Sequence, residues 1–267
     1  MLIIQAVVLG FVQGLSELLP ISSSGHLIIT SQIFNWPDQG LAFDAVIHLG
    51  TLMAVVVLLR RDLIDIFFKK TSIPKQGWKF APDWRWLNII LLAILPALVV
   101  GFLFGDQLEA FGRRVDLVAL NLIFWGVVLW LAERVSKKQL VNYNEIDSKQ
   151  SLVVGLAQVL ALLPGTSRSG ITMTAGLAQK FSKELAVKFS FLISVPVVFL
   201  SGIWGLYQLW STGFSEINLS LIIIGFVTSF LGGVIAIKLI FAWLKDHNFT
   251  IFVIYRIALG IGLLIFL

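Results

Sequence analysis

Residues 164–170 have the sequence Pro164-Gly165-Thr166-Ser167-Arg168-Ser169-Gly170, and they interrupt an apolar stretch that runs from residue 151 to residue 178. A second apolar stretch, 2–34, is interrupted in a similar way by Leu19-Pro20-Ile21-Ser22-Ser23-Ser24-Gly25. Proline and glycine destabilise the interior of a helix, so each interruption predicts a turn between two half-helices. In both breaks Leu-Leu-Pro and one further residue are followed by two hydroxyl residues, which indicates a weak internal repeat.

The composition is that of a membrane protein. Of the 267 residues, 58% are hydrophobic and 13% are charged, whereas soluble domains average about 45–50% apolar and about 25% charged residues. The net charge of +5 does not indicate nucleic-acid binding, because the Lys and Arg residues form short clusters between apolar stretches, as in proteins that are oriented in a membrane. The chain has no cysteine, which excludes disulfides and thiolate metal sites.

Six other apolar stretches are long enough, or nearly so, for helices that cross about 30 Å of hydrocarbon. They are 41–59, 87–105, 117–133, 189–210, 218–237 and 249–267. Lys and Arg cluster in the connections 60–86, 134–149, 178–188 and 238–248, whereas 35–40, 106–116 and 211–217 contain only Arg113 and Arg114. Because basic loops stay in the cytoplasm, the first group is predicted to be cytoplasmic and the second external.

The sides of these connections constrain the two interrupted stretches. Residues 151–178 begin and end beside cytoplasmic connections, so they are predicted to form a re-entrant hairpin from the cytoplasm, while 2–34 enters from outside. The predicted fold is an all-α integral membrane protein with two inverted-topology repeats, each a re-entrant helical hairpin plus three transmembrane helices. Its parts are a single membrane domain (1–267), a first repeat (1–133), a cytoplasmic linker (134–150) and a second repeat (151–267). The alternative is a pair of ordinary kinked helices.

Each break places small hydroxyl residues at the start of a half-helix, where free N–H groups and the positive end of the helix dipole bind anions. The hydroxyl donors are Ser22, Ser23 and Ser24 at the first break and Thr166, Ser167 and Ser169 at the second. Arg168 adds a permanently charged fork that suits phosphate oxygens. An arginine at membrane depth costs about 2.5–3.5 kcal/mol on insertion scales, so Arg168 is predicted to bind phosphate or to pair with Glu17.

Glu17 lies just before the first break, and Gln13 lies on the same helical face because it is four residues earlier. The Glu17 carboxylate is a candidate general base, a candidate ligand of a divalent cation and a candidate partner of Arg168. His26 directly follows the serines of the break and is a candidate base, nucleophile or phosphate donor, or a structural residue.

Three further polar residues lie in or near the predicted spans. His48 is expected to be structural, or to contact a site residue without contacting the substrate itself. Asp44 and Arg256 are candidates for intramembrane ion pairs.

Two motifs resemble the signatures of a known family. The first is Gln13-Gly14-Leu15-Ser16-Glu17-Leu18-Leu19-Pro20-Ile21-Ser22-Ser23-Ser24-Gly25-His26, and the second is Pro164-Gly165-Thr166-Ser167-Arg168-Ser169-Gly170-Ile171-Thr172. In order and separation they resemble the signatures of the undecaprenyl-diphosphate phosphatases, the bacitracin-resistance protein family. The hydropathy pattern is similar over essentially the whole chain. Gln13 stands where many members have glutamate, and the family pattern admits either residue.

The resemblance implies a multi-pass enzyme of the bacterial cytoplasmic membrane. The family removes the terminal phosphate from undecaprenyl diphosphate, a polyprenyl diphosphate lipid, which recycles the carrier for peptidoglycan synthesis and confers resistance to bacitracin. The resemblance also implies a requirement for Mg²⁺ or Ca²⁺, with Glu17 as a candidate ligand. The site is expected to open to the external side, because the family's substrate is released there.

The motifs also carry predicted roles. By position in the motifs, the predicted catalytic residues are Ser23, Glu17 and His26, and the predicted substrate-binding residues are Arg168, Ser167, Ser22, Ser24, Ser169, Thr172 and Gln13. Three routes remain open: attack on phosphorus by Ser23 with Glu17 as base, attack by His26, and direct attack by water. A lipid-phosphate or anion transporter also remains open, because inverted repeats with broken helices are a transporter plan. The sequence does not indicate an oligomeric state.

Overall fold

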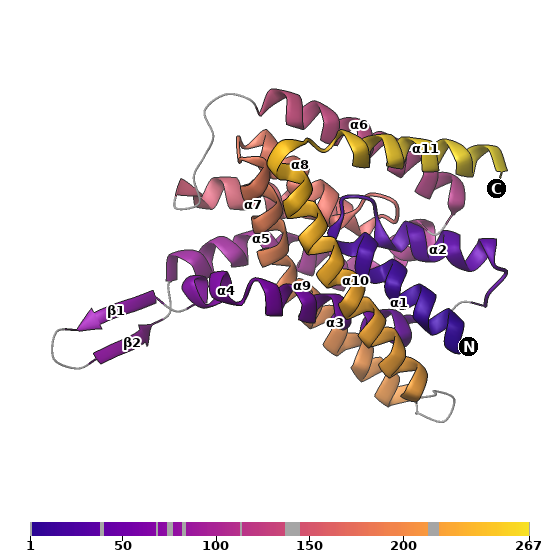
Figure 1. The fold of residues 1–267 in the computed structure, drawn as a ribbon, viewed down its shortest axis with the longest axis horizontal. Helices are drawn as coiled ribbons and strands as arrows, with labels where there is room; N and C mark the ends of the chain where they lie inside the picture. Colours follow the sequence, from indigo (N-terminus) through magenta and orange to yellow (C-terminus); the bar gives the residue numbers. More distant parts are fainter. Residues whose placement is uncertain are drawn as a thin grey trace.

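In the computed structural model the chain is a bundle of helices with one short β-hairpin (Figure 1). The structure describes residues 2–37, 40–67, 69–73, 77–81, 84–112, 114–136, 145–212 and 219–266. The helices of the first half are α1 (Ile3–Leu18), α2 (Ser23–Ile33), α3 (Leu41–Leu58), α4 (Arg60–Phe67), α5 (Trp84–Gly112) and α6 (Val115–Val135). Those of the second half are α7 (Ser148–Val159), the 3₁₀ turn η2 (Leu160–Leu162), α8 (Arg168–Ala178), α9 (Lys183–Thr212), α10 (Leu219–Asp246) and α11 (Thr250–Phe266).

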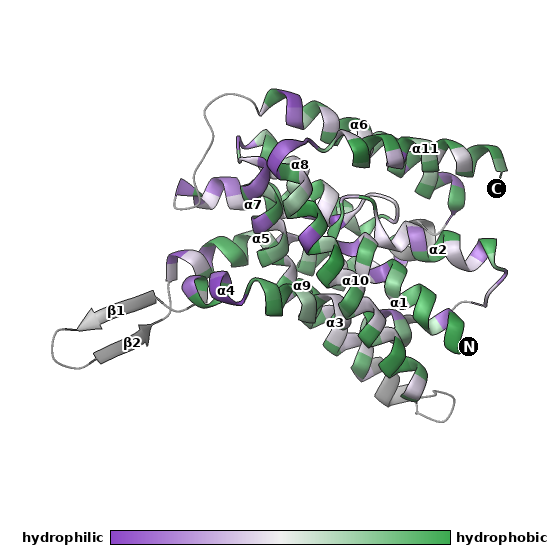
Figure 2. Cartoon of the chain, in the orientation of Figure 1, coloured by the Kyte–Doolittle hydropathy of each residue, from purple (hydrophilic) through white to green (hydrophobic). Residues whose placement is uncertain are grey.

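Four helices, α5, α6, α9 and α10, are long and apolar enough to cross a membrane, and they confirm the predicted spans 87–105, 117–133, 189–210 and 218–237. The predicted span 41–59 is α3, which qualifies only together with α4, from which it is bent by 78°. The predicted span 249–267 is α11, whose 17 residues stand at the lower limit for a crossing. Hydrophobic residues predominate along α6 and α11 (Figure 2). The chain is therefore a multi-pass membrane protein.

The four basic connections meet at one end of the bundle. The contacts that join them are Lys188–Asp62, Arg85–Ile146, Ser136–Phe181 and Lys183–His247. Parts of the predicted connections 35–40, 60–86, 106–116, 134–149 and 211–217, Arg113 among them, lie outside the described residues. The basic segments that are described therefore share one side of the molecule, as the charge pattern predicts.

The two interrupted stretches form hairpins at opposite ends of the bundle. Gln150 in the first turn of α7 donates to the carbonyl of Gln179, just after α8, at 3.4 Å, so the α7–α8 hairpin begins and ends beside the basic connections. The α1–α2 hairpin instead shares an apolar cluster with the first turns of α3 and α10, through Ala6, Leu9, Leu27, Phe43 and Leu221. The predicted breaks are therefore turns inside the bundle, and kinked continuous helices are excluded.

Both breaks end in a serine with a left-handed backbone. Ser22 has φ 76° and Ser167 has φ 73°, and α2 and α8 begin at the following residue. In this geometry Ser22-Ser23-Ser24-Gly25 corresponds to Ser167-Arg168-Ser169-Gly170, one residue away from the match that the Leu-Leu-Pro pattern suggests. Gly165, at φ 88°, takes up the additional residue in the second turn, because glycine adopts this conformation without steric cost.

The connection 60–86 contains a feature that the sequence did not predict. Strands β1 (Lys69–Ile73) and β2 (Gly77–Ala81) pair in antiparallel register, with Lys69 opposite Ala81 and Ile73 opposite Gly77. Residues 69–73 lack the alternation of apolar and polar residues that indicates a strand. The helical prediction is confirmed for the apolar segments, and this hairpin is an addition to it.

Candidate active site

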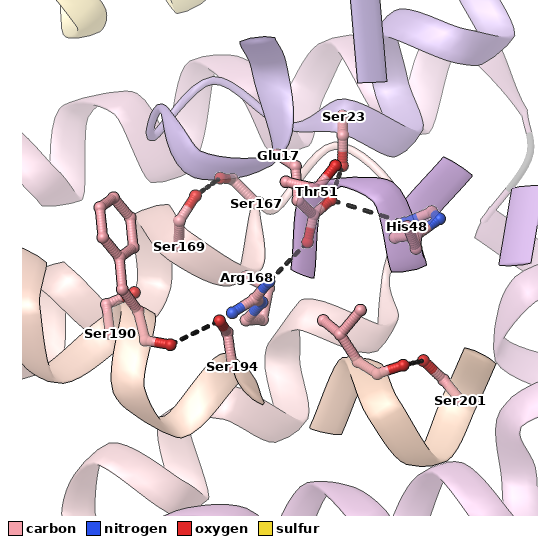
Figure 3. Close-up of polar contacts among 12 residues, drawn as sticks. Glu17, Ser23, His48, Thr51, Ser167, Arg168, Ser169, Ser190, Ser194 and Ser201 are labelled. Atoms are coloured by element: carbon pink, nitrogen blue, oxygen red, sulfur yellow. Dashed lines mark hydrogen bonds and ion pairs between the residues drawn. The ribbon is translucent and has the colours of Figure 1, made fainter. Parts of the chain in front are cut away.

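Glu17 is the centre of a buried polar cluster that joins the two breaks (Figure 3). Its Oε1 accepts a hydrogen bond from Arg168 Nη2 at 2.5 Å. Its Oε2 accepts from Ser23 Oγ at 2.5 Å and from Gln13 Nε2 at 3.0 Å. Both carboxylate oxygens are therefore hydrogen-bonded, and one of the donors is a charged guanidinium. Four of the predicted site residues therefore meet, and the predicted Glu17–Arg168 ion pair is confirmed.

Local structure explains why these side chains meet. Gln13 and Glu17 are one helical turn apart on α1, so both reach the same side. Ser23 and Arg168 are each the first residue of a half-helix, α2 and α8, directly after a left-handed serine. Helix α1 packs closely on α10, because a Cβ at Gly14 would lie 2.2 Å from the carbonyl oxygen of Ser229. This packing fixes the position of Glu17, which lies one turn after Gly14 on α1.

Several buried polar atoms around the cluster have no hydrogen-bond partner among the residues that the structure describes. They are Arg168 Nη1, Thr166 Oγ1 and Gln13 Oε1. The Arg168 side chain is 13% exposed and Thr166 is fully buried. Buried polar groups are nearly always paired in proteins, so unpaired ones beside a buried ion pair are candidate contacts for a ligand. The first two atoms are donors, a guanidinium N–H and a hydroxyl, which suit the oxygens of an anion.

The other predicted hydroxyls support the breaks. Ser22 and Ser24 lie 3.4 Å apart through their Oγ atoms, and Ser167 and Ser169 lie 3.2 Å apart in the corresponding arrangement. Ser167 also accepts from the N–H of Gly170, and Ser169 donates to the carbonyl of Leu19 in the first break. Thr172 contacts the carbonyl of Arg168 and Ser190 on α9. Its contacts hold the first turn of α8 in place.

His26 is engaged away from Glu17. Its Nδ1 lies 2.7 Å from the carbonyl of Ser22 and its Nε2 lies 2.6 Å from the hydroxyl of Tyr255, on which its ring stacks. A carbonyl only accepts, so Nδ1 carries the proton and Nε2 accepts from Tyr255. Both ring nitrogens are therefore occupied, and the catalytic role of His26 stays a prediction.

His48, for which the sequence predicted only a structural or supporting role, lies beside the Glu17 carboxylate. Its Nε2 lies 3.5 Å from Glu17 Oε2 (Figure 3). Its Nδ1 donates to the carbonyl of Asp44. The position one turn from Asp44 on an apolar helix gave no signal of this contact.

Comparison with known proteins agrees with the geometry. The family model described as "Bacitracin resistance protein BacA" matches residues 6–262. The chain belongs to this family. It is 40% identical over 276 residues to "Undecaprenyl-diphosphatase 1" of Pseudoalteromonas translucida (strain TAC 125), with 100% of this chain and 99% of the relative covered. It is also 42% identical over 262 residues to "Undecaprenyl-diphosphatase" of Moorella thermoacetica (strain ATCC 39073 / JCM 9320), with 97% and 96% covered. The resemblance inferred from the two motifs is confirmed.

Arg256 of this BacA-family chain, a candidate for an intramembrane ion pair, has other partners in the structure. In place of an ion pair, its guanidinium donates to main-chain carbonyls of both breaks, with Pro20 O at 3.2 Å and Thr166 O at 2.9 Å. No sequence pattern marks a partner that is a backbone group.

The BacA-family cluster has oxygen ligands for a hard cation, but few of them. Among the described residues no three His, Cys, Asp or Glu side chains come together. Mg²⁺ commonly takes one or two carboxylates and completes its shell with substrate phosphates and water. The Glu17 carboxylate and the unpaired Gln13 Oε1 match that donor set. The residues therefore fit a cation that is held mainly by its substrate.

Proposed function

We propose that the chain hydrolyses undecaprenyl diphosphate to undecaprenyl phosphate and inorganic phosphate at the Glu17–Ser23–Arg168 cluster. The observation that carries the proposal is the buried Arg168 Nη1, a guanidinium N–H without a partner beside a serine that donates to a carboxylate. The family match and the names of the two relatives support the substrate and the reaction. The product recycles the carrier lipid for cell-wall synthesis, and the family description fits a part in bacitracin resistance.

Substrate binding follows from the two half-helix starts. The first turns of α2 and α8 offer backbone N–H groups and the positive ends of their dipoles to the diphosphate. Arg168 Nη1 and the Thr166 hydroxyl add donors from the second break. The polyprenyl tail lies among the exposed apolar faces of the helices, where hydrocarbon is its natural surroundings.

In the favoured route Ser23 is the nucleophile. Its Oγ–H already donates to Glu17 Oε2 at 2.5 Å, so the carboxylate takes the proton as Oγ attacks the terminal phosphorus. The Oγ–P bond forms, the bridging P–O bond breaks, and undecaprenyl phosphate leaves. The proton on Glu17 passes to the leaving undecaprenyl phosphate, so the carboxylate is regenerated. Water then attacks the phosphoserine with Glu17 as base, the Oγ–P bond breaks, inorganic phosphate leaves, and the proton returns to Ser23 Oγ. Arg168 stabilises the charge on the transferring group throughout. The occupied nitrogens of His26 favour this route over attack by His26.

A divalent cation, Mg²⁺ or Ca²⁺, belongs to the proposal as well. Glu17 and Gln13 would hold it, and when bound it would neutralise charge on the phosphate oxygens. Ser23 and Arg168 would contact the diphosphate directly in that arrangement.

The inverted repeat is also part of the proposal, and three observations support it. The two breaks share the left-handed serine and the Ser···Ser contact two residues apart. Gly10 and Gln13 precede the first break as Gly155 and Gln158 precede the second. If α1 corresponds to α7, α5 to α10 and α6 to α11, the packed pair α1–α10 of one repeat corresponds to the packed pair α7–α5 of the other. The packed pair α6–α11 then corresponds to itself. The repeats would be 1–133 and 151–267 within one membrane domain.

Membrane orientation follows the charge pattern. The basic end of the bundle would face the cytoplasm of a bacterial cell and the chain would lie in its inner membrane. The site would open to the external side, next to the α1–α2 hairpin.

Purified protein in detergent tests this function through the release of inorganic phosphate from undecaprenyl or farnesyl diphosphate, with Mg²⁺ or Ca²⁺ present or chelated. Release that depends on the cation is the expected result. A transporter has no compartments to work between in detergent. Absence of release, together with movement of a lipid phosphate or anion in vesicles, would therefore overturn the enzyme assignment.

A further inference from the structure

Arg256 on α11 is a fully buried cation whose charge faces only main-chain carbonyls. It is 0% exposed. Nε donates to Leu122 O, Nη1 to Pro20 O, and Nη2 lies within 3.4 Å of the carbonyls of Asn121, Gly165 and Thr166. Among the described residues no carboxylate pairs with it. A buried charge without a counter-ion is costly, so this arrangement has to serve a purpose.

The carbonyls that Arg256 binds belong to both breaks. Pro20 lies in the first break, and Gly165 and Thr166 lie in the second. These residues follow the ends of α1 and η2, in the irregular backbone between the half-helices. Backbone carbonyls at membrane depth need partners there. They carry partial negative charge beside the place where a diphosphate has to bind, so without a cation on them they would repel the substrate.

We propose that Arg256 is a positioning residue for phosphate transfer. It fixes the two breaks relative to each other, so that Glu17 and Ser23 from one break meet Arg168 from the other, and it screens the diphosphate from the main-chain carbonyls of the two turns. It touches no reacting atom. The inference rests on the proposed function, since its consequence is a rate of diphosphate hydrolysis.

Neighbouring residues are arranged around the same guanidinium. Asn121 on α6 donates through its side-chain Nδ2 to the carbonyl of Pro164 at 2.9 Å. The main-chain carbonyl of Asn121 accepts from Arg256 Nη2. A Cβ at Gly170, in the first turn of α8, would lie 2.8 Å from Arg256 Nη1. Contacts of α6, α8 and α11 therefore all converge on this one side chain.

A double-mutant cycle tests the positioning role. Arg256→Lys keeps the charge but replaces a five-donor fork with three donors on a single nitrogen. We expect kcat to fall about 30-fold or more while KM changes less than about threefold. In the Arg168→Lys background the same change is expected to cost less than about threefold, because the alignment it protects is already lost. Equal losses in both backgrounds would overturn the proposal, since a general loss of folded protein gives that result.

A distance measurement tests the proposal without activity. Because the chain has no cysteine, spin labels on Ile33→Cys and Ala178→Cys report the separation of the ends of α2 and α8. We expect Arg256→Lys to broaden or shift this distribution, and the control Arg114→Lys, at the exposed start of α6, to leave it unchanged. An unchanged distribution in Arg256→Lys overturns the proposal. A broadened distribution in a protein that never releases phosphate sinks the proposed function alone.

Gly170→Ala provides a second variant if Arg256→Lys does not fold. Its methyl group would lie 2.8 Å from Arg256 Nη1 and 3.1 Å from Cβ and Oγ of Ser167, so it pushes against the guanidinium and the second break while the arginine stays in place. We expect a fall in kcat and a broadened distance distribution, and wild-type values for both would overturn the proposal.

Discussion

Glu17 and Arg168 are joined by an ion pair of 2.5 Å although they lie 151 positions apart in the chain. One comes from the end of α1 and the other from the start of α8, so neither hairpin holds the site alone. The carboxylate proposed to receive the serine proton and the guanidinium proposed to bind phosphate come together only when both breaks are in place. The stability of the hairpin arrangement and the chemistry of the site are therefore coupled.

Breaking this pair should affect stability and activity differently. Glu17→Ala leaves Arg168 partly buried and unpaired, which is expected to cost about 3–5 kcal/mol of unfolding free energy. Glu17→Ala combined with Arg168→Met removes both charges and is expected to regain most of that stability, with activity still absent. Thermal unfolding in detergent measures the first effect and phosphate release the second. A double variant as unstable as the single one would contradict the ion-pair assignment.

Removal of the proposed nucleophile should abolish turnover. Ser23→Ala is expected to lower kcat about 10³-fold with the protein still folded, because the Oγ that attacks phosphorus is gone. Thr30→Ala, on the same helix, is the matched control and should keep wild-type activity. Turnover of Ser23→Ala within about threefold of wild type would exclude the serine route.

Two substitutions of His26 distinguish a nucleophilic role from a structural role of this side chain. Its Nδ1–H donates to Ser22 O at 2.7 Å, and an asparagine side-chain amide can make a similar bond. His26→Asn is therefore expected to keep about tenfold more activity than His26→Ala, because it holds the first turn of α2. Equal and complete loss in both variants would identify the imidazole itself as the reacting group.

The packing of α1 on α10 should be sensitive to a single methyl group. At Gly14 a Cβ would meet the carbonyl of Ser229 at 2.2 Å, whereas at Gly262 on α11 nothing lies within 4 Å. Gly14→Ala is expected to lose about 1–3 kcal/mol of stability through overpacking and to lower kcat by displacing Glu17. Gly262→Ala should change neither quantity. Similar unfolding temperatures for the two variants would count against close α1–α10 packing.

The helices and the two breaks could be predicted from the sequence because a membrane span requires a long apolar stretch, and because Lys and Arg gather in the loops on one side. Proline and glycine marked the breaks, and Arg168 was recognisable because an arginine at that depth needs a reason to be there. A pair with Glu17 was one of its two expected roles, because an ion pair offsets the cost of a charge at that depth.

The remaining features could not be predicted, for physical reasons. Arg256 binds backbone carbonyls 90 to 236 positions away, and a carbonyl has no sequence signature. The correspondence of Ser22 with Ser167 depends on the left-handed backbone of Gly165, which shifts the match by one residue. The approach of His48 to Glu17 depends on how α3 packs against α1, a tertiary relationship that hydropathy does not encode.

Phosphate release from undecaprenyl diphosphate by purified Arg168→Ala, measured beside wild type and the exposed control Arg114→Ala, tests the central claim most directly. The account predicts cation-dependent release by wild type and by Arg114→Ala, and a loss of about 10³-fold or more in kcat/KM for Arg168→Ala. Release by Arg168→Ala at a rate close to that of wild type would contradict a diphosphatase site between the two breaks.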